Sequence, residues 1–487
     1  MEKIFADTRK LDERARDIFE LTEDLMMENA AIGLKQQIES FPEVKSAAIF
    51  CGGGNNGADG YALARLLQEK YKVIVVEVIP ASSEKCVEQK IRCQRLGIQI
   101  INFEGQQLNQ IVGNLENLAV VDCIFGSGFH GILPDEILKL VEQINQLNCV
   151  KIACDISSGL QFKADVTVTM GGQKIQLYTE RGKEVSGKIV VAPLGLCRQK
   201  FESTCYTNKF LLNYDDAKLP VRKNSSCHKG NFGHAVIAGG EKIGAAGLSA
   251  TASLHFGAGY SSVITEQKIN FGNQENDLTF ELMTSKEIPS NATSFAIGPG
   301  FGRNSNLFAE YLNVAEEKKL PVVLDADAFY YESIDGFLNK RCSNSICLPT
   351  VLTPHPKEFA ALLSNCGLGR FTTEEVLENL DLCVDVFCRN HPGIVLLVKG
   401  SIVTIAVKLK SENDVFVYKN PWGTNALAKA GSGDVLTGLI NGLLAQNYSA
   451  LDAAITASLV HAKCSESENN FSLTPFGIIQ NLDKLNS

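Results

Sequence analysis

The chain has 487 residues, which is more than one hydrophobic core usually supports, so we expect two domains. Hydrophobic residues make up 45% of it and charged residues 21%, a balance typical of folded globular proteins that excludes a disordered or low-complexity chain. The formal net charge is -9 and no long basic run occurs, so nucleic acid is not expected as a partner.

The first part of the chain has the pattern of an α/β domain. An amphipathic helix is predicted over residues 8–38, and short apolar strands then alternate with helix-length segments. Continuous apolar strands separated in this way are typical of a parallel sheet with helices on both faces. The polar segment Arg198–Ser226 is interpreted as the connection to a second block. The strands are predicted at Ala47–Phe50, Val73–Ile79, Ala119–Asp122, Val150–Asp155, Val166–Met170 and Gly187–Ala192.

A glycine-rich turn joins the first of these strands to a helix predicted at Tyr61–Lys70. Gly52, Gly54 and Gly57 match the pattern GxGxxG, and Glu77 follows twenty residues after the last of them, at a strand end. The pattern suits the phosphate cradle of a dinucleotide-binding fold, and tight backbone packing is an equally good explanation. No GK[ST] follows, which excludes the phosphate loop of a nucleoside triphosphatase.

Two further strands end in polar sequences, DCIFGSG from Asp122 and DISSG from Asp155. Because the carboxyl ends of parallel strands meet at one edge of a sheet, we expect these residues and the glycine turn to share a crevice. Oxygens of Asn56, Asp122 and Ser158 suit a hard cation, and Asp155 is placed to exchange a proton with a bound substrate. The structural alternative is that both aspartates cap helices or hold loops.

A second α/β block begins with a strand predicted at His234–Gly239. A glycine- and alanine-rich helix is predicted over Gly244–Gly259, and another helix follows the sequence GSGD near the end of the chain. This order predicts a doubly wound sheet. The N-terminus of a helix near the end of the chain would then point toward the carboxyl ends of the strands. The intervening strands are predicted at Ser294–Ile297, Val322–Asp325, Val351–Thr353 and Val395–Lys399.

The GSGD sequence predicts an anion site at the start of its helix. Gly431, Ser432 and Gly433 carry little side-chain bulk, so backbone N–H groups can approach a phosphoryl group there. Asp434 is placed to take a proton from a hydroxyl that attacks phosphorus. The structural alternative is that the glycines form a turn and Asp434 is the cap of the helix.

The glycine turn, FGSG and DISSG together resemble the NAD(P)H-hydrate epimerase domain over about residues 8–195, and the opening sequences RKLD and MENA resemble that family's first helix. The resemblance implies a Rossmann-like three-layer α/β/α domain that interconverts the R and S epimers of hydrated NADH or NADPH, with Asp155 as a catalytic residue. It also implies potassium near Asn56, Asp122 and Ser158. This chain departs from the family at Ala58, usually a glycine, and at Phe129-His130, which lie at the pocket rim. Substrate contacts are implied at Asn55, Asn56, Gly57, Asp59, Gly126, Ser127, Gly128 and Asp155.

In the second block the motifs HKG, GPGFGR, LDADA, TPHPKE and VKGS lie beside successive strands. Taken singly, His355, Asp325 and Asp327 are explained by structural roles. The whole set resembles the ADP-dependent NAD(P)H-hydrate dehydratases of the ribokinase-like superfamily over about residues 208–480. That resemblance implies ADP as co-substrate, Mg²⁺, and Asp434 as the catalytic base. Contacts with the hydrated nicotinamide are implied at Ala246, Gly300, His355 and Asp434, and contacts with the nucleotide at Lys399, Gly400, Ser401, Ile402, Val403 and Gly433.

The sequence therefore favours a nicotinamide nucleotide repair enzyme, with an epimerase domain over residues 1–207 and a ribokinase-like α/β dehydratase domain over 208–487. Its ligands would be hydrated NADH or NADPH and an adenine nucleotide, and a homo-oligomer is expected. One alternative is a small-molecule vitamin-precursor kinase whose N-terminal domain is a non-catalytic binding module. An NAD-dependent dehydrogenase is a weaker alternative, since it uses only the GxGxxG pattern.

The fifteen cysteines are odd in number and include no Cys-x-x-Cys pair, so neither a disulfide framework nor a zinc site of that kind is predicted. The opening sequence MEKIFADTRKLDERARD lacks the apolar core of a signal peptide. No apolar run approaches the ~20 residues of a membrane-spanning helix. We expect a cytoplasmic protein with reduced thiols and no membrane partner.

Overall fold

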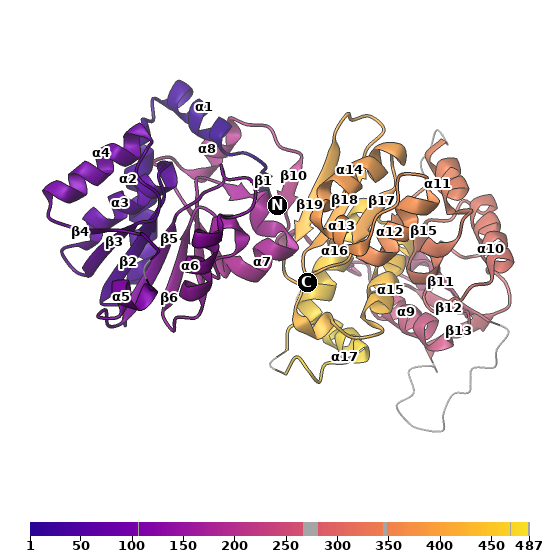
Figure 1. The fold of residues 1–487 in the computed structure, drawn as a ribbon. Helices are drawn as coiled ribbons and strands as arrows, with labels where there is room; N and C mark the ends of the chain where they lie inside the picture. The colour runs from indigo at the N-terminus through magenta and orange to yellow at the C-terminus, as the bar shows by residue number, and fades with distance from the viewer. Residues whose placement is uncertain (106, 266–280, 344–347, 468, 486–487) are drawn as a thin grey trace. The chain divides into compact units, whose positions relative to one another are not determined.

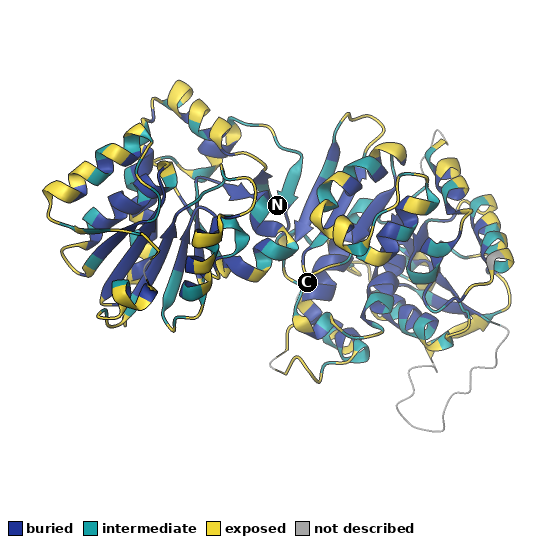
Figure 2. Cartoon of the chain, in the orientation of Figure 1, coloured by how far each residue is buried: buried dark blue, intermediate teal, exposed yellow. Residues whose placement is uncertain are grey.

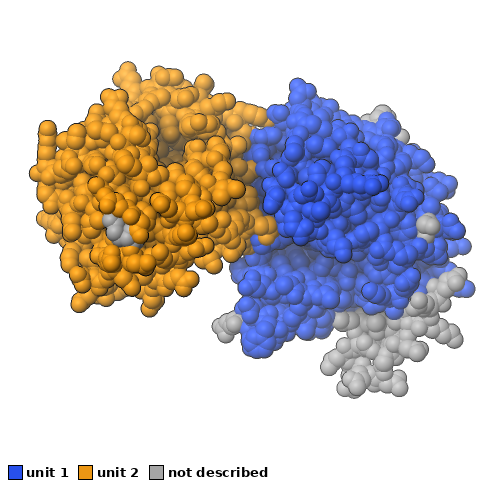
Figure 3. All heavy atoms as spheres, in the orientation of Figure 1, with its two compact units in different colours: residues 1–2, 208–487 blue, residues 3–207 orange. Residues whose placement is uncertain are grey.

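The computed structural model describes residues 1–487 except 106, 266–280, 344–347, 468 and 486–487. The chain divides into two compact units, which Figure 3 colours separately. Lys3–Thr207 form the N-terminal unit, and Met1–Glu2 with Asn208–Ser487 form the C-terminal unit. Both are built from parallel strands and helices (Figure 1), which confirms the predicted α/β class.

The N-terminal unit contains a parallel sheet in the order β4-β3-β2-β5-β6-β7-β9. A second, shorter parallel pair is formed by β1 (Glu2–Phe5) with β8 (Gln173–Lys174). The sequence prediction contained neither of these short strands, nor β4. The strands of the sheet are β2 (Ser46–Cys51), β3 (Lys72–Glu77), β4 (Gln99–Asn102), β5 (Leu118–Cys123), β6 (Val150–Cys154), β7 (Val166–Met170) and β9 (Lys188–Ala192).

Both faces of this sheet are covered by helices, which is why its strands are apolar throughout. Along β2, Ala47 and Ile49 pack into one core, with residues of α2, α3 and α4, while Ala48 and Phe50 pack into another, with residues of α5 and α6. Figure 2 shows the buried strands between these two layers. The helices are α1 (Arg9–Phe19), α2 (Glu23–Glu39), α3 (Asn55–Leu67), α4 (Glu84–Arg95), α5 (Leu108–Val112), α6 (Asp135–Asn145), α7 (Glu180–Ser186) and α8 (Arg198–Ser203).

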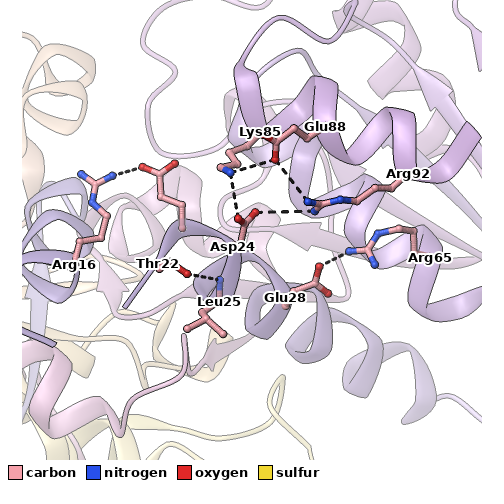
Figure 4. Close-up of polar contacts among 10 residues, drawn as sticks. Arg16, Thr22, Asp24, Leu25, Glu28, Arg65, Lys85, Glu88 and Arg92 are labelled. Carbon is pink, nitrogen blue, oxygen red and sulfur yellow. Dashed lines mark hydrogen bonds and ion pairs between the residues drawn. The ribbon is translucent and has the colours of Figure 1, made fainter. Parts of the chain in front are cut away.

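The prediction of one helix over residues 8–38 is wrong, because α1 and α2 are separate. Glu20 ends α1 in a left-handed conformation (φ 53), and Thr22 caps α2 by accepting a hydrogen bond from the N–H of Leu25 at 3.3 Å. After this break, Asp24 on α2 forms an ion pair with Lys85 on α4 at 3.2 Å (Figure 4). The break therefore turns α2 to lie against its neighbours in the helical layer.

In the C-terminal unit the strands run in the order β13-β12-β11-β14-β15-β16-β17-β18-β19-β10. They are parallel except around β18, which pairs antiparallel with β17 and β19. The strands are β10 (Lys209–Leu211), β11 (His234–Ala238), β12 (Tyr260–Ile264), β13 (Met283–Ser285), β14 (Ser294–Ile297), β15 (Val322–Leu324), β16 (Thr350–Leu352), β17 (Val395–Val398), β18 (Val403–Lys408) and β19 (Val415–Asn420).

Two helical layers enclose this sheet as well. Residues of α10, α11, α12, α13 and α14 share one core with it, and residues of α9, α15, α16 and α17 share the other. Across the described residues, no helix combines the length and apolarity needed to cross a bilayer. The helices are α9 (Ile243–His255), α10 (Ser305–Glu317), α11 (Ile334–Ser343), α12 (Pro356–Asn365), α13 (Thr373–Glu378), α14 (Leu380–Asn390), α15 (Ser432–Ala445), α16 (Ala450–Cys464) and α17 (Pro475–Gln480).

Two predictions for this region need correction. The segment Arg198–Ser226 is not purely a connection, since it contains α8 and the sheet strand β10. The helix predicted to reach Gly259 ends at His255, because Gly257 adopts a positive φ of 100° and the chain then enters β12.

Candidate active sites

A cavity of about 600 Å³ opens at the carboxyl ends of β2, β5 and β6 in the N-terminal unit. The start of α3 and the FGSG turn after β5 form its walls. Gly57 lies outside this lining, buried against the backbone of Gly52. The other residues predicted to contact substrate are brought together in the lining, namely Asn55, Asn56, Asp59, Gly126, Ser127, Gly128 and Asp155.

The glycines of the GxGxxG pattern serve two different purposes. A Cβ on Gly52 would lie 1.9 Å from the carbonyl oxygen of Ile124, and one on Gly57 would lie 1.9 Å from the carbonyl oxygen of Gly52. Gly54 has nothing within 4 Å of a Cβ and lines the cavity. Backbone packing therefore requires the first and third glycines, while the second leaves access to the α3 terminus.

Alanine substitutions separate these purposes. We expect Gly52→Ala to lower the free energy of unfolding by about 2 kcal/mol or more, because its methyl group overlaps a backbone carbonyl. Gly54→Ala is expected to change it by less than about 1 kcal/mol, since φ is -98° and the site is open. Urea unfolding monitored by circular dichroism measures both; equal losses would contradict the distinction.

Asp155 follows β6 in a left-handed backbone conformation (φ 70) and forms a buried ion pair. Its Oδ1 lies 2.5 Å from Nζ of Lys174, which is itself only 2% exposed. The N–H of Ser127 donates to Oδ2 at 2.9 Å, and the N–H of Met170 donates to Oδ1 at 3.3 Å. Burial alone would raise the pKa of Asp155, but the Lys174 ammonium and these donors outweigh it and hold the pKa below its ordinary value. The carboxylate is thus ionised at neutral pH.

Two other carboxyl groups of this cavity behave in the opposite way. Burial, followed by the negative charge of Asp155, raises the pKa of Asp59 well above its ordinary value. Burial also raises the pKa of Asp12 to about 6, although the nearby Lys174 opposes the shift. A carboxylate whose pKa is held down and carboxyl groups whose pKa values are raised therefore line the same cavity, an arrangement suited to general acid–base chemistry.

Of the predicted cation ligands, Asn56 lines this cavity, while Asp122 and Ser158 lie outside its lining. Asp122 is buried, and its Oδ1 accepts hydrogen bonds from Oγ of Ser158 at 2.6 Å and from the N–H of Ile124 at 3.1 Å. Burial raises the pKa of Asp122 to about 6. Nδ2 of Asn56 is buried without a hydrogen-bond partner, but this atom is a donor and offers no ligand to a cation. The buried carboxylate of Asp122 and the hydroxyl of Ser158 are oxygen groups that suit a hard cation.

In the C-terminal unit Lys399 follows β17 and lies among carboxylates. Its Nζ is 2.8 Å from Oδ1 of Asp325 and 3.6 Å from Oε2 of Glu358. Oδ2 of Asp325 accepts a hydrogen bond from Oγ1 of Thr437, on α15, at 2.7 Å. Burial would lower the pKa of Lys399, but the charges of Asp325 and Glu358 outweigh it and raise the pKa. A Cβ on Gly433 would lie 3.3 Å from this ammonium group, so the start of α15 meets the ends of β15 and β17.

Asp434 lies in the first turn of α15 and is not its cap. Gly431 (φ 96) is the N-cap residue, and no side chain caps the helix, so the capping alternative is wrong. Among the described residues, no hydrogen-bond donor contacts the carboxylate of Asp434. Burial, followed by the negative charge of Asp325, raises its pKa to about 6. The side chain is thus an unengaged base whose pKa lies close to neutral pH.

His355 has a clear structural role in addition to any chemical one. It is the N-cap of α12, where its Nδ1 accepts hydrogen bonds from the N–H groups of Lys357 and Glu358 at 3.2 and 3.3 Å. Its Nε2 lies 3.1 Å from Oε1 of Glu358, while its side chain remains 44% exposed. His355 therefore orients Glu358, which in turn faces Lys399.

The remaining predicted residues surround this group less closely. Ala246, on α9, is fully buried, and Gly300 has a positive φ of 58° with its α-carbon facing the carbonyl of Lys242. The segment 400–403 turns from β17 into β18, with Ile402 buried and Ser401 exposed. A cavity of about 850 Å³ on this unit is lined by other residues, among them Phe301. None of the predicted site residues lines that cavity.

Comparisons with known proteins identify the family of this chain. Residues 23–175 match the family model described as YjeF-related protein N-terminus, and residues 234–477 match the one described as NAD(P)H-hydrate dehydratase. The chain is 38% identical to the bifunctional NAD(P)H-hydrate repair enzyme Nnr of Helicobacter pylori, with 100% of each chain covered. It belongs to the family of bifunctional NAD(P)H-hydrate repair enzymes. The resemblance found in the motifs is thereby confirmed.

Other members of the repair enzyme family are more distant. The Moorella thermoacetica enzyme is 29% identical over 95% of this chain and 91% of its own. Among solved structures, ADP/ATP-dependent NAD(P)H-hydrate dehydratase from Bacillus subtilis, co-crystallised with ATP/Mg²⁺, is 23% identical over 56% of this chain and 96% of that chain, with a TM-score of 0.46.

The sequence analysis missed three polar residues that contact predicted site residues. Lys174 comes from a two-residue strand that no periodicity reveals, and Thr437 lies inside an otherwise apolar helix. His461, on α16, lies with Nε2 3.2 Å from Oγ of Ser432, and burial lowers its pKa to about 4, so it is neutral. Only the position of Thr437, one turn after the GSGD sequence, gave a signal that could have been followed.

Glu77, the acidic residue of the dinucleotide-binding pattern, has a structural role in this repair enzyme. Its Oε1 lies 2.6 Å from Nζ of Lys90 and accepts hydrogen bonds from the Tyr61 hydroxyl and the N–H of Ala81, each at 3.1 Å. Glu77 therefore ties α3 and α4 to the end of β3, and the dehydrogenase alternative loses its ribose-binding residue.

Proposed function

We propose that this chain repairs hydrated nicotinamide nucleotides. The C-terminal domain, residues 208–487, converts the S epimer of hydrated NADH or NADPH to NADH or NADPH with ADP, giving AMP and phosphate. The N-terminal domain, residues 1–207, interconverts the R and S epimers. The observation that carries the proposal is Asp434: an unengaged carboxylate with a pKa of about 6, in the first turn of a helix beside the Lys399 ammonium.

The dehydratase step follows from this placement. Asp434 accepts the proton of the substrate's 6-hydroxyl group as that oxygen attacks the β-phosphorus of ADP, and AMP leaves. The backbone N–H group of Gly433 and the ammonium of Lys399 stabilise the charge that develops on the phosphoryl oxygens. Phosphate then leaves with the help of the ring nitrogen's lone pair, and loss of a proton from the neighbouring carbon restores the dihydronicotinamide. The hydroxyl group of the substrate thus leaves as phosphate, which is a better leaving group than hydroxide.

The adenine nucleotide and Mg²⁺ are proposed to bind on the same side of the sheet as Asp434. The segment Lys399–Val403 and Gly433 would contact the adenine nucleotide, while Ala246, Gly300 and His355 would contact the hydrated nicotinamide. Asp325 and Glu358 are already paired with Lys399, so Mg²⁺ would be held chiefly by phosphate oxygens of the nucleotide, as is common. The ion supplies neutralisation of phosphoryl charge.

For the epimerase we propose Asp155 as the base and Asp59 as the acid, because their environments move the two pKa values apart. Asn55, Asn56 and the 126–128 turn would hold the substrate in the cavity. Potassium would be held by Asn56, Asp122 and Ser158, where it compensates the buried Asp122 charge. Gly57 would act through the backbone turn and not by direct contact.

Two further properties belong to the proposal. The described cysteines are all free thiols, which supports a reducing, cytoplasmic location. A homo-oligomer is proposed on the general frequency of such assemblies among metabolic enzymes, and sedimentation velocity of the purified chain tests it.

The function is tested by adding the purified chain, ADP and Mg²⁺ to a mixture of R and S hydrated NADH and following the absorbance of reduced nicotinamide. We expect complete recovery of NADH, faster than spontaneous epimerisation allows. A plateau at the S fraction would retain the dehydratase and remove the epimerase. A stable phosphorylated product without NADH recovery would instead establish the kinase alternative.

A further inference from the structure

A cluster of three metal-ligating side chains lies away from both sites. Asp335 is on α11, Cys366 directly follows α12, and His391 directly follows α14. One ligand atom from each lies within 4.8 Å of the other two. The three helices belong to one layer of the C-terminal unit, in the orange part of the ribbon in Figure 1. The residues are far apart in sequence, so no spacing motif predicts the cluster.

The polar contacts of His391 show where in the cluster an ion would lie. Its Nδ1 lies 3.2 Å from the carbonyl oxygen of Phe387, and its Nε2 lies 3.1 Å from Oδ1 of Asp335. Both partners are acceptors, whereas a neutral imidazole has a single N–H. With the N–H on Nδ1, where the carbonyl of Phe387 accepts it, the lone pair of Nε2 faces Oδ1 of Asp335 and the two atoms can share a cation.

The surroundings and the dimensions of this position both fit a cation. His391 is only 1% exposed, so packing holds its imidazole in place. A metal-bound histidine usually donates its other N–H to a backbone carbonyl, as His391 does to Phe387. The 3.1 Å separation of Nε2 and Oδ1 is close to the roughly 3.3 Å between two ligands of a tetrahedral zinc ion.

Asp335 and Cys366 are also placed to bind an ion. Oδ2 of Asp335 accepts a hydrogen bond from Nδ2 of Asn339 at 2.8 Å, which turns Oδ1 toward His391. Asp335 and Cys366 are both half-buried, so an ion can enter from solvent. We propose that Asp335, Cys366 and His391 bind a zinc-class divalent cation, with water in the fourth position.

The position of the cluster points to a structural role. His355 precedes α12 and Cys366 follows it, so the ten residues of this helix place the two about 15 Å apart along its axis. A metal here would join the ends of α12 and α14 to α11 without entering the Asp434 site. The inference is independent of the proposed function.

The test uses the full chain, reduced and stripped of metal with a chelator. Zn²⁺ is titrated against a chromophoric competitor, and Co²⁺ is added separately to record its spectrum. We expect the parent chain to bind one Zn²⁺ that Cys366→Ser binds at least about tenfold more weakly. Cobalt should give a thiolate-to-metal charge-transfer band in the parent and lose it in Cys366→Ser. Cys149→Ser, which removes another half-buried thiol, is the matched control and should behave as the parent.

A second measurement does not depend on the variant folding. Zinc-edge X-ray absorption of the loaded parent chain should show one sulfur and at least one imidazole among the ligands. Equal zinc affinity in the parent and Cys366→Ser, or a ligand shell of oxygen and nitrogen alone, would overturn the proposal. The cluster would then be a hydrogen-bonded contact that joins α11, α12 and α14.

Discussion

Asp434→Asn is expected to remove most dehydratase turnover while making the protein more stable. A carboxamide cannot accept the proton of the attacking hydroxyl, and loss of a general base typically costs 10²- to 10⁴-fold in rate. The parent reaction should slow as pH falls through about 6, where Asp434 becomes protonated. NADH recovery from the S epimer, measured across pH for both proteins, tests this expectation. Retained turnover in Asp434→Asn would remove the proposed mechanism.

The gain in stability follows from the direction of the same pKa shift. The pKa of Asp434 is about 6 in the folded chain against an ordinary 3.8, so folding disfavours the ionised carboxylate. Any stabilisation from this group is complete below pH 3.8 and is lost as pH rises through about 6. At pH 8 the variant should therefore be more stable than the parent by about 1–3 kcal/mol.

Thermal unfolding at two pH values measures this effect. The advantage of Asp434→Asn should disappear near pH 4, where the parent carboxyl group is also neutral. Asp483→Asn, at an exposed position, is the control and should alter neither turnover nor stability. A variant that loses turnover and also stability at pH 8 would indicate a structural role for Asp434.

Much of the fold could be predicted because it depends on local patterns. Continuous apolar runs such as Ala119–Asp122 identified the buried parallel strands, whose two faces fill two separate cores. Short strands such as β1 and β8 carry too few residues to show a period. The antiparallel strands β18 and β19 were not predicted either, although each has six residues, because they follow one another directly and do not fit the alternation of strand and helix.

The sites could be predicted only in part, for a different physical reason. Asp155 and Asp434 each stand next to a recognisable turn, so their positions follow from the strand order. The groups that set their pKa values come from distant parts of the chain. Lys399 pairs with Asp325 across 74 residues, and no local pattern indicates that pair. Lys174, which holds Asp155 in its ionised form, likewise becomes visible only in the folded chain.

Asp155→Asn is expected to slow epimerisation by at least about 10²-fold, because an amide neither carries the charge nor accepts the proton. Asparagine tolerates the left-handed backbone at this position (φ 70) as well as aspartate does. In the coupled assay, NADH should appear rapidly up to the S fraction and then only at the spontaneous rate. Unchanged epimerisation would make the N-terminal unit a non-catalytic binding module.

A double variant separates chemistry from folding in this experiment. Asp155→Asn leaves Lys174, which is only 2% exposed, without its carboxylate partner, and removing one member of a buried pair typically costs about 3–5 kcal/mol. Adding Lys174→Met removes the unpaired charge and should restore most of the lost stability. Epimerisation should stay slow in the double variant, because the base is still absent. If activity returned together with stability, Asp155 would be a structural residue, and the base of the epimerase would have to be sought among the other carboxyl groups of the cavity.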